Sequence, residues 1–105
     1  MKKAPAALED AVVAALRTVY DPEIPVNIYD LGLVYSVDAS EDGKVFITMT
    51  LTAPACPVAG VLPGQVEAAV RAVEGVTDVS VELTFDPPWD QARISPEALL
   101  KLGLL

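Results

Sequence analysis

Apolar residues recur along this chain with two different periods, and these periods predict its helices and strands. Between residues 5 and 19 they recur every three or four positions, which is typical of an amphipathic helix that buries one face. A second helical pattern covers residues 58–74 and is followed by Gly75, a residue suited to a helix C-cap. A Ser-Pro-Glu sequence at residues 95–97 indicates the start of a short last helix.

Three other stretches alternate between apolar and polar residues, which is the period of a strand with one buried face. They cover residues 33–39, 44–51 and 77–85, and the turn between the first two contains Asp42-Gly43, a strong hairpin signal. The side chains expected to face the core are Leu33, Tyr35 and Val37 in the first strand, Val45, Ile47, Met49 and Leu51 in the second, and Val79, Val81, Leu83 and Phe85 in the third.

The elements follow in the order α-β-β-α-β-α, which predicts a small two-layer α/β (α+β) sandwich. Its three-stranded mixed sheet carries helices on one face, since a hairpin joins the first two strands and a right-handed helical crossover makes the third parallel to the second. Residues 1–105 are expected to form a single domain because no linker or repeat interrupts them. Val34 and Phe46 fall on the uncovered face, where they form a modest apolar patch consistent with a homodimer or partner surface.

Composition and charge disfavour several classes of function. The seven basic and fifteen acidic residues give a net charge of −8, which disfavours nucleic acid and acidic membranes as partners. No stretch of about 18 uncharged apolar residues predicts a membrane span, and Glu9 and Asp10 interrupt any signal-peptide pattern, so we expect a cytoplasmic protein. The absence of histidine and the single cysteine argue against histidine-based catalysis, an internal disulfide and a multi-thiolate metal site within one chain.

Three loops are predicted to meet at one end of the sheet. Residues 20–32 lead into the first strand, residues 52–60 follow the second, and residues 85–89 follow the third. Ligand sites of α/β sheets favour the carboxyl ends of parallel strands, and Cys56 lies in the middle loop. The other residues of this predicted loop cage are Asp21, Glu23, Asn27, Asp30, Thr52, Pro57, Asp86 and Trp89.

The residues alone leave two interpretations of Cys56 open. Cys56 lies just before Pro57, at a predicted helix start, where backbone N–H groups and the helix dipole favour the thiolate that binds metals or attacks electrophiles. The nearby acidic residues oppose this effect, because negative charge raises the pKa of a thiol. The alternative is a buried thiol that acts as a small hydrophobe. The loop carboxylates have a similar alternative, because such groups often cap backbone N–H groups in turns. Trp89 fits a cover over the edge of the core better than a ligand platform.

Three stretches of the sequence resemble the motifs of a known family. Residues 21–35 (DPEIPVNIYDLGLVY), 49–57 (MTLTAPACP) and 86–89 (DPPW), the last followed by Ile94-Ser95 and residues 101–103, are similar to the SufT/PaaD/MIP-type iron–sulfur cluster assembly domain family. The resemblance covers nearly the whole chain. Because the sequence ends without the cysteine-rich extension of PaaD-type members, it looks closest to the stand-alone bacterial SufT-like proteins.

This resemblance implies a small two-layer α/β domain that helps iron–sulfur proteins to mature and is not an enzyme. Its partners would be scaffold, carrier or apo-client proteins, and Cys56 matches the characteristic thiol of the family. A cluster usually needs about four ligands, so we expect no stably bound cofactor. The leading hypothesis is a transient iron–sulfur cluster that is shared between chains. Cys56 would be one of its ligands, and in a homodimer the second copy of the chain would supply another.

The alternative within the same family is a non-catalytic adaptor that binds scaffold or apo-client proteins without holding a cluster. A thiol enzyme is disfavoured, because the chain has neither a histidine base nor a second, resolving cysteine.

Overall fold

The structure, a computed structural model, describes residues 6–21, 24–52 and 61–103 of the chain. Its elements are α1 (Ala6–Leu16), β1 (Val34–Ala39), β2 (Lys44–Met49), α2 (Leu62–Arg71), β3 (Asp78–Leu83), a 3-10 helix (Gln91–Arg93) and α3 (Pro96–Lys101). This order confirms the predicted α-β-β-α-β-α arrangement. The 3-10 helix was not expected from the sequence.

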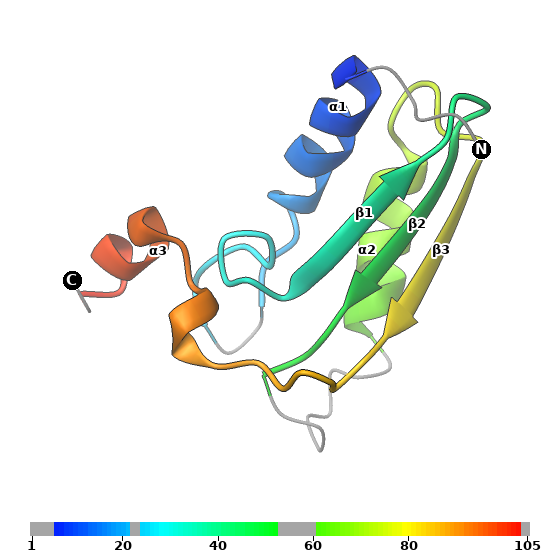
Figure 1. The fold of residues 1–105 in the computed structure, drawn as a ribbon. Helices are drawn as coiled ribbons and strands as arrows, with labels where there is room; N and C mark the ends of the chain where they lie inside the picture. Colours follow the sequence, from blue (N-terminus) through cyan, green and yellow to red (C-terminus); the bar gives the residue numbers. More distant parts are fainter. Residues whose placement is uncertain (1–5, 22–23, 53–60, 104–105) are drawn as a thin grey trace.

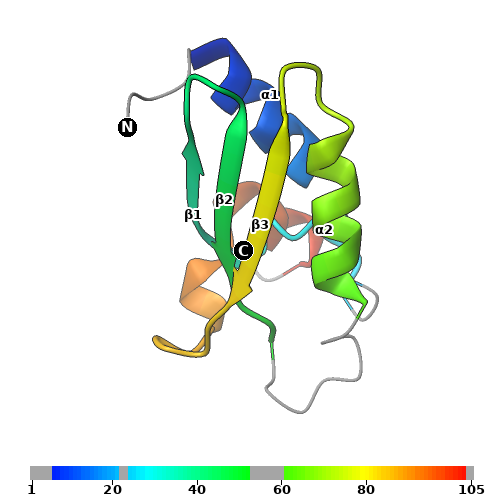
Figure 2. The same cartoon turned by 90° about the vertical axis from the view of Figure 1, so that its right-hand side faces the viewer.

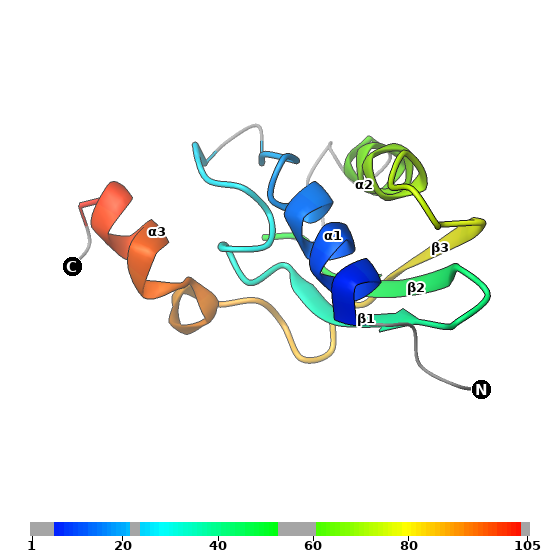
Figure 3. The same cartoon turned by 90° about the horizontal axis from the view of Figure 1, so that it is seen from above.

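The sheet is mixed, as predicted, and its strand order is β1-β2-β3. β1 runs antiparallel to β2 through the turn at residues 40–43, while β2 and β3 are parallel in register from Lys44 and Asp78 to Met49 and Leu83. Helices α1 and α2 lie on the same face of the sheet, and α3 lies beyond one end of it (Figures 1 and 3). Figure 2 shows α2 running beside β3. The fold is therefore a small α+β sandwich with one lateral extension.

The core lies between the sheet and helices α1 and α2. Every second side chain of β2 is buried, which confirms the inward face predicted for this strand. Burying a large apolar side chain contributes about 1.5–3 kcal/mol, so this layer is the main source of stability. The fully buried side chains at its centre include Val12, Leu16, Ile47, Met49, Leu62, Val66 and Val70.

β1 departs from the predicted alternation because a bulge interrupts its pairing with β2 between Val34 and Ser36. An extra residue in one strand changes the phase of its side chains. Val34 pairs with the buried Met49 and packs against the core, whereas the hydroxyl of Tyr35 donates to the carbonyl of Pro87 at 2.7 Å. The predictions that Tyr35 faces the core and that Val34 faces away from it are therefore wrong.

The third strand is shorter than its pattern predicts. Its ladder with β2 closes where the Thr84 N–H donates to the Met49 carbonyl at 2.9 Å, and the chain then leaves the sheet. Phe85 is consequently 38% exposed, so its predicted place in the core is wrong. Phe46 is 42% exposed on the uncovered sheet face, as predicted.

The two longer helices also cover less of the chain than their patterns predict. α1 ends at Leu16, where the Thr18 hydroxyl bonds to the Ala15 carbonyl at 2.6 Å and the chain turns. α2 ends at Arg71 instead of residue 74, and its predicted first turn at residues 58–60 lies outside the described residues. None of the helices in the described ranges has the length and apolar character needed to cross a membrane.

Candidate functional site

One end of the sheet gathers the segments that enter and leave its strands (Figure 1). β2 and β3 end there, while β1 and α2 begin there. Residues 17–21, 24–33 and 84–95 lie at this end, and so do Thr52 and Val61, the described residues that flank the loop containing Cys56. We term it the loop end, and the opposite end, with its turn at residues 40–43, the hairpin end.

Three of the predicted site residues cannot be placed. Cys56, Pro57 and Glu23 lie outside the described residues, so their part in the site stays a prediction. The described members of the predicted loop cage can be placed, and their contacts follow.

Hydrogen bonds tie the two described loop-end segments together. The Trp89 indole Nε1 donates to the Leu31 carbonyl at 2.7 Å, and the Ser95 N–H donates to the Asp30 carbonyl at 2.8 Å. The ring of Trp89 is partly buried and packs against the core. Trp89 therefore covers the edge of the core and fastens the C-terminal segment to the turn that precedes β1.

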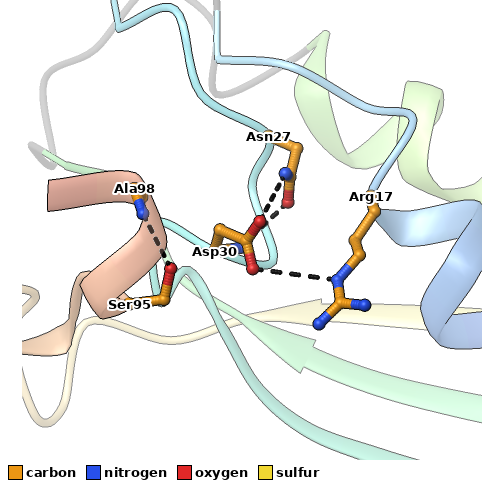
Figure 4. Close-up of polar contacts among 5 residues, drawn as sticks. All are labelled: Arg17, Asn27, Asp30, Ser95 and Ala98. Atoms are coloured by element: carbon orange, nitrogen blue, oxygen red, sulfur yellow. Dashed lines mark hydrogen bonds and ion pairs between the residues drawn. The ribbon is translucent and has the colours of Figure 1, made fainter. Parts of the chain in front are cut away.

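Asn27 and Asp30 are hydrogen-bonded to each other within that turn (Figure 4). The Asn27 Oδ1 accepts from the Asp30 N–H at 2.9 Å, and its Nδ2 donates to Asp30 Oδ2 at 2.8 Å. The other carboxylate oxygen, Asp30 Oδ1, lies 3.7 Å from Nε of Arg17. Both oxygens of Asp30 thus have partners within the chain, and these contacts fix the turn.

Asp21 has a comparable role one turn earlier. Its Oδ1 accepts from the Ile24 N–H at 3.2 Å, and its own N–H donates to the Val26 carbonyl at 3.3 Å. Its side chain is buried with these partners. Asp21 therefore stabilises the start of the segment between α1 and β1.

Asp86 and Thr52 are more open to solvent. Asp86 is exposed, and its N–H donates to the Thr84 hydroxyl at 3.3 Å. Thr52 is half-buried at the end of β2. Within residues 6–21, 24–52 and 61–103, no group of three or more metal-ligating Cys, His, Asp or Glu side chains is found. The described acidic residues of the loop end therefore do not form a metal site among themselves.

A contact between Arg93 and Tyr35 is not predicted by any sequence pattern. The Arg93 guanidinium lies 4.5 Å from the Tyr35 ring centroid, on the side to which the β1 bulge turns this ring. A Cβ on Gly32 would come within 2.3 Å of the Arg93 carbonyl oxygen, and Gly32 has a φ of +78°. The glycine before a strand is the one local signal in the sequence for this close approach.

Large apolar side chains are exposed at the loop end. Tyr20 and Val61 are each 55% exposed, and Phe85 is 38% exposed. Tyr20 follows α1, Val61 precedes α2 and Phe85 follows β3, so three separate segments contribute. Exposed apolar groups gathered at one end of a small domain are typical of a protein contact surface.

The chain belongs to the family described as iron-sulfur cluster assembly protein, which it matches over residues 9–83. It is 55% identical over 97 residues to an "Fe-S protein maturation auxiliary factor" of Porphyromonas gingivalis, covering 92% of each chain. It is 42% identical over 98 residues to the "Fe-S protein maturation auxiliary factor YitW" of Bacillus subtilis, covering 93% of this chain and 96% of that one.

The fold is similar to a solved structure as well. The crystal structure of the domain of unknown function DUF59 from Bacillus anthracis matches with a TM-score of 0.88 and 39% identity, covering 95% of each chain. The family predicted from the sequence motifs is therefore confirmed.

Proposed function

We propose that this chain is an accessory factor in the maturation of iron–sulfur proteins, in which Cys56 supplies a transient ligand to a cluster or to a partner protein. The observation that carries the proposal is the single thiol of the sequence, in the loop between Thr52 and Val61 at the loop end. The names of the two curated relatives, both Fe–S protein maturation auxiliary factors, support the same role.

The number of thiols argues that the cluster is cargo. An iron–sulfur cluster usually takes about four ligands, whereas one chain offers one cysteine and no histidine. Further ligands must come from a second copy, a scaffold, a carrier or an apo-client protein. A cluster held in this shared way is bound weakly by each chain, as transfer requires. We therefore propose a non-enzymatic role without a stably bound cofactor.

The hydrogen bonds between the segments of the loop end support this role. Trp89 and Ser95 bond to the turn at Leu31 and Asp30, so that the segments beside the Cys56 loop have fixed positions. A partner that binds at the loop end therefore meets described segments that are already fixed, which lowers the entropic cost of binding. The exposed Tyr20, Val61 and Phe85 supply apolar contact area for that partner.

The first test compares Cys56→Ser with wild type in cells that lack their own maturation factor of this family. We expect the variant to keep its melting temperature but to lower the activity of an iron–sulfur reporter enzyme about tenfold or more, because serine is a poor ligand for iron. Ser80→Ala, a similarly small change at an exposed position of β3, is the matched control and should behave as wild type. Equal complementation by Cys56→Ser would rule out the thiol role.

The second test is anaerobic isolation of the chain with iron and sulfide assayed per chain and the mass measured. Substoichiometric iron and sulfide that accompany a dimer or a partner complex, and that disappear in Cys56→Ser, support the shared cluster. A full cluster on a monomer would contradict it.

The alternative function is an adaptor that holds no cluster, and the three exposed apolar residues of the loop end favour it specifically. For an adaptor, Cys56→Ala keeps both partner binding and maturation, whereas Tyr20→Ser combined with Phe85→Ser lowers both. If the double variant matures the reporter as well as wild type does, the adaptor surface is not at the loop end.

A further inference from the structure

Helices α1 and α2 cover one face of the sheet, and the middle of the opposite face is open to solvent (Figure 3). We term this middle part the open face. It consists of two neighbouring rows of paired residues, one formed by Asp38, Phe46 and Ser80 and the next, toward the loop end, by Ser36, Thr48 and Glu82. Thr48 is half-buried and the other five are exposed. The Phe46 ring is 42% exposed, so an aromatic surface lies at the centre of the open face among small or charged side chains.

Two carboxylates flank Phe46 diagonally, on opposite sides of β2. Asp38 of β1 is opposite Phe46 itself, while Glu82 of β3 is opposite Thr48, two residues farther along β2. Neighbouring strands are about 4.8 Å apart and successive residues about 3.3 Å, so the two Cα atoms are about 12 Å apart. Within the described part of the chain, neither carboxylate lies within 4.0 Å of a basic group.

The nearest cations on either side of the open face already have acidic partners. Lys44, at the hairpin end of β2, lies 3.8 Å from Asp42. Arg71 reaches β3 from α2 and lies 2.8 Å from Glu67 and 3.6 Å from Asp78. These charges therefore do not neutralise the two carboxylates beside Phe46.

Two arginines near β1 must be counted as well. Arg17 follows α1 and lies 3.7 Å from Asp30, so its charge is shared with that carboxylate. The Arg93 guanidinium lies over the Tyr35 ring at 4.5 Å. Tyr35 is three residues before Asp38, about 10 Å along the strand, so Arg93 weakens the negative potential at the loop end of β1 more than around Phe46. The open face keeps a local excess of negative charge.

We propose that the open face docks a basic amphipathic helix of a partner protein, which crosses the three strands diagonally and covers Phe46. Two-layer domains bury a sheet face by packing helices on it. Residues i, i+4 and i+7 share one face of a helix, and the outer two are about 10.5 Å apart along its axis, a separation that flexible lysine side chains extend to reach Asp38 and Glu82. The fitting helix has basic residues at i and i+7 and an apolar residue at i+4.

This interaction goes beyond the proposed function, because it uses neither Cys56 nor the exposed apolar residues of the loop end. A second copy of the chain does not fit as the occupant. Each chain carries a net charge of −8, and contact between two open faces would bring four carboxylates together. None of the helices in the described ranges carries two basic residues at the required spacing either.

The test uses the full chain, labelled with nitrogen-15, and a capped alanine–glutamine helical peptide of about 18 residues, long enough to hold a helix in water. One face of the peptide carries a leucine at i+4 between lysines at i and i+7. We expect a Kd of about 1 mM or tighter, with the largest amide shift changes at Phe46, Thr48 and their partners in β1 and β3.

Two control peptides separate the geometry from general attraction between opposite charges. A peptide with glutamates in place of the lysines should bind about tenfold more weakly, because two favourable charge pairs become repulsive. A peptide with the same net charge but with its lysines on the side opposite the leucine should lose most of this advantage.

Variants of the chain assign the effect to the open face. Asp38→Lys combined with Glu82→Lys should invert the preference for lysine over glutamate, whereas Asp10→Lys combined with Glu74→Lys is the matched control. The control makes the same change in net charge at exposed positions in α1 and after α2, and should keep the preference.

Phe46→Thr keeps a residue that favours strands and should weaken binding about fivefold while the amide spectrum stays that of the folded chain. Cys56→Ser should bind the peptide as wild type does, so failure of the thiol role and failure of this site can be told apart.

Four results would overturn the proposal. They are no binding of the lysine peptide at about 1 mM, equal binding of the glutamate peptide or of the peptide with displaced lysines, shift changes confined to α1 or to the loop end, and a dimer of the peptide-free chain that already buries Phe46.

Discussion

The two ends of the sheet are built in different ways. The hairpin end is closed by contacts to a four-residue turn, where the Thr77 N–H donates to the Gly43 carbonyl at 2.8 Å and the Thr77 hydroxyl to the Asp42 carbonyl at 2.9 Å. The loop end joins residues much farther apart in the sequence, such as Trp89 and Leu31, which are 58 positions apart. Exposed large apolar side chains occur at the loop end, whereas the turn itself consists of Ser, Glu, Asp and Gly.

This difference indicates how the chain separates stability from function. The hairpin end fixes the strand register with few residues and leaves no apolar surface in its turn. The loop end needs a long segment before β1 and another after β3 to build its frame, and it presents Tyr20, Val61 and Phe85 to solvent. Changes at the hairpin end should therefore affect stability alone, while changes at the loop end should affect stability and maturation activity together.

The largest effect is expected from Gly32→Ala at the loop end. The new Cβ would lie 2.3 Å from the Arg93 carbonyl oxygen, at a residue whose φ is +78°. The strain and the forced movement of the 3-10 helix should lower the free energy of unfolding by about 3 kcal/mol, measured by urea denaturation. Maturation activity should fall even at a temperature where the variant is folded.

Two glycine variants are the controls for this prediction. Gly43→Ala at the hairpin end creates a similar clash, 2.3 Å from the Gly75 carbonyl oxygen, and should lower stability by a similar amount but leave the activity of the folded fraction intact. Gly64→Ala has no heavy atom within 4 Å of its Cβ and should be neutral or slightly stabilising. If Gly43→Ala lowers the activity of folded protein as much as Gly32→Ala does, the two ends do not differ in function.

The second effect in size is expected from Trp89→Phe. This change keeps most of the ring but removes the N–H that bonds to the Leu31 carbonyl, so the free energy of unfolding should fall by about 1–2 kcal/mol. Circular dichroism is the measurement, because the variant has no tryptophan fluorescence.

At the hairpin end, Thr77→Val removes the exposed hydroxyl bond to Asp42 and should cost only about 0.5 kcal/mol. A larger loss for Thr77→Val than for Trp89→Phe would reverse the comparison between the two ends.

The parts of this fold that could be predicted from the sequence are those fixed by local patterns. The alternation of β2 and the Ser95 cap of α3, whose hydroxyl accepts from the Ala98 N–H at 3.2 Å, depend on neighbouring residues alone. The direction of Tyr35 could not be predicted, since it depends on a bulge and on a bond to Pro87, 52 residues away. Phe85 was misplaced for a related reason, because its pattern does not reveal that the chain leaves the sheet at Thr84.

The candidate site divides in the same way. Turn chemistry in the sequence could suggest that the Asn27 side chain acts on a backbone group, and its Oδ1 does accept from the Asp30 N–H. The Asp30 carboxylate instead accepts from the side-chain amide of Asn27. The partner of each is three residues away, within reach of a local rule. The Arg17–Asp30 ion pair and the Arg93–Tyr35 contact join separate segments, and no local spacing encodes them.

The third effect is expected from Asn27→Ala, which tests whether the Asn27–Asp30 turn is structural. Removing the Asn27 side chain leaves the Asp30 N–H without its acceptor, so the free energy of unfolding should fall by about 1 kcal/mol. Maturation activity per folded chain should stay within about twofold of wild type. Asp86→Ala, at an exposed loop-end position, is the control and should change stability by less than about 0.5 kcal/mol. A loss of activity without a loss of stability would instead make Asn27 a partner or ligand contact.

The smallest effect is expected at the hairpin end, where Ser40 acts on Asp42. The hydrogen bond from the Ser40 hydroxyl, aided by the charge of Lys44, holds the pKa of Asp42 below its ordinary value, and desolvation opposes them. A lowered pKa in the folded state means that the ionised carboxylate favours folding above the pKa of the unfolded chain. This contribution is lost as the pH falls through the folded-state value.

Ser40→Ala should therefore raise the pKa of Asp42 towards its ordinary value, and the acid-side loss of stability that Asp42 causes should shrink. Carbon-13 NMR titration of the Asp42 carboxyl is the direct measurement, and urea denaturation between about pH 5 and pH 2 follows the stability. Because Asp42 is exposed at the end without the thiol loop, maturation activity at neutral pH should not change. A change in that activity would show that the two ends of the sheet are coupled through β2, and an unchanged pKa would mean that the Ser40 hydroxyl does not stabilise the Asp42 carboxylate.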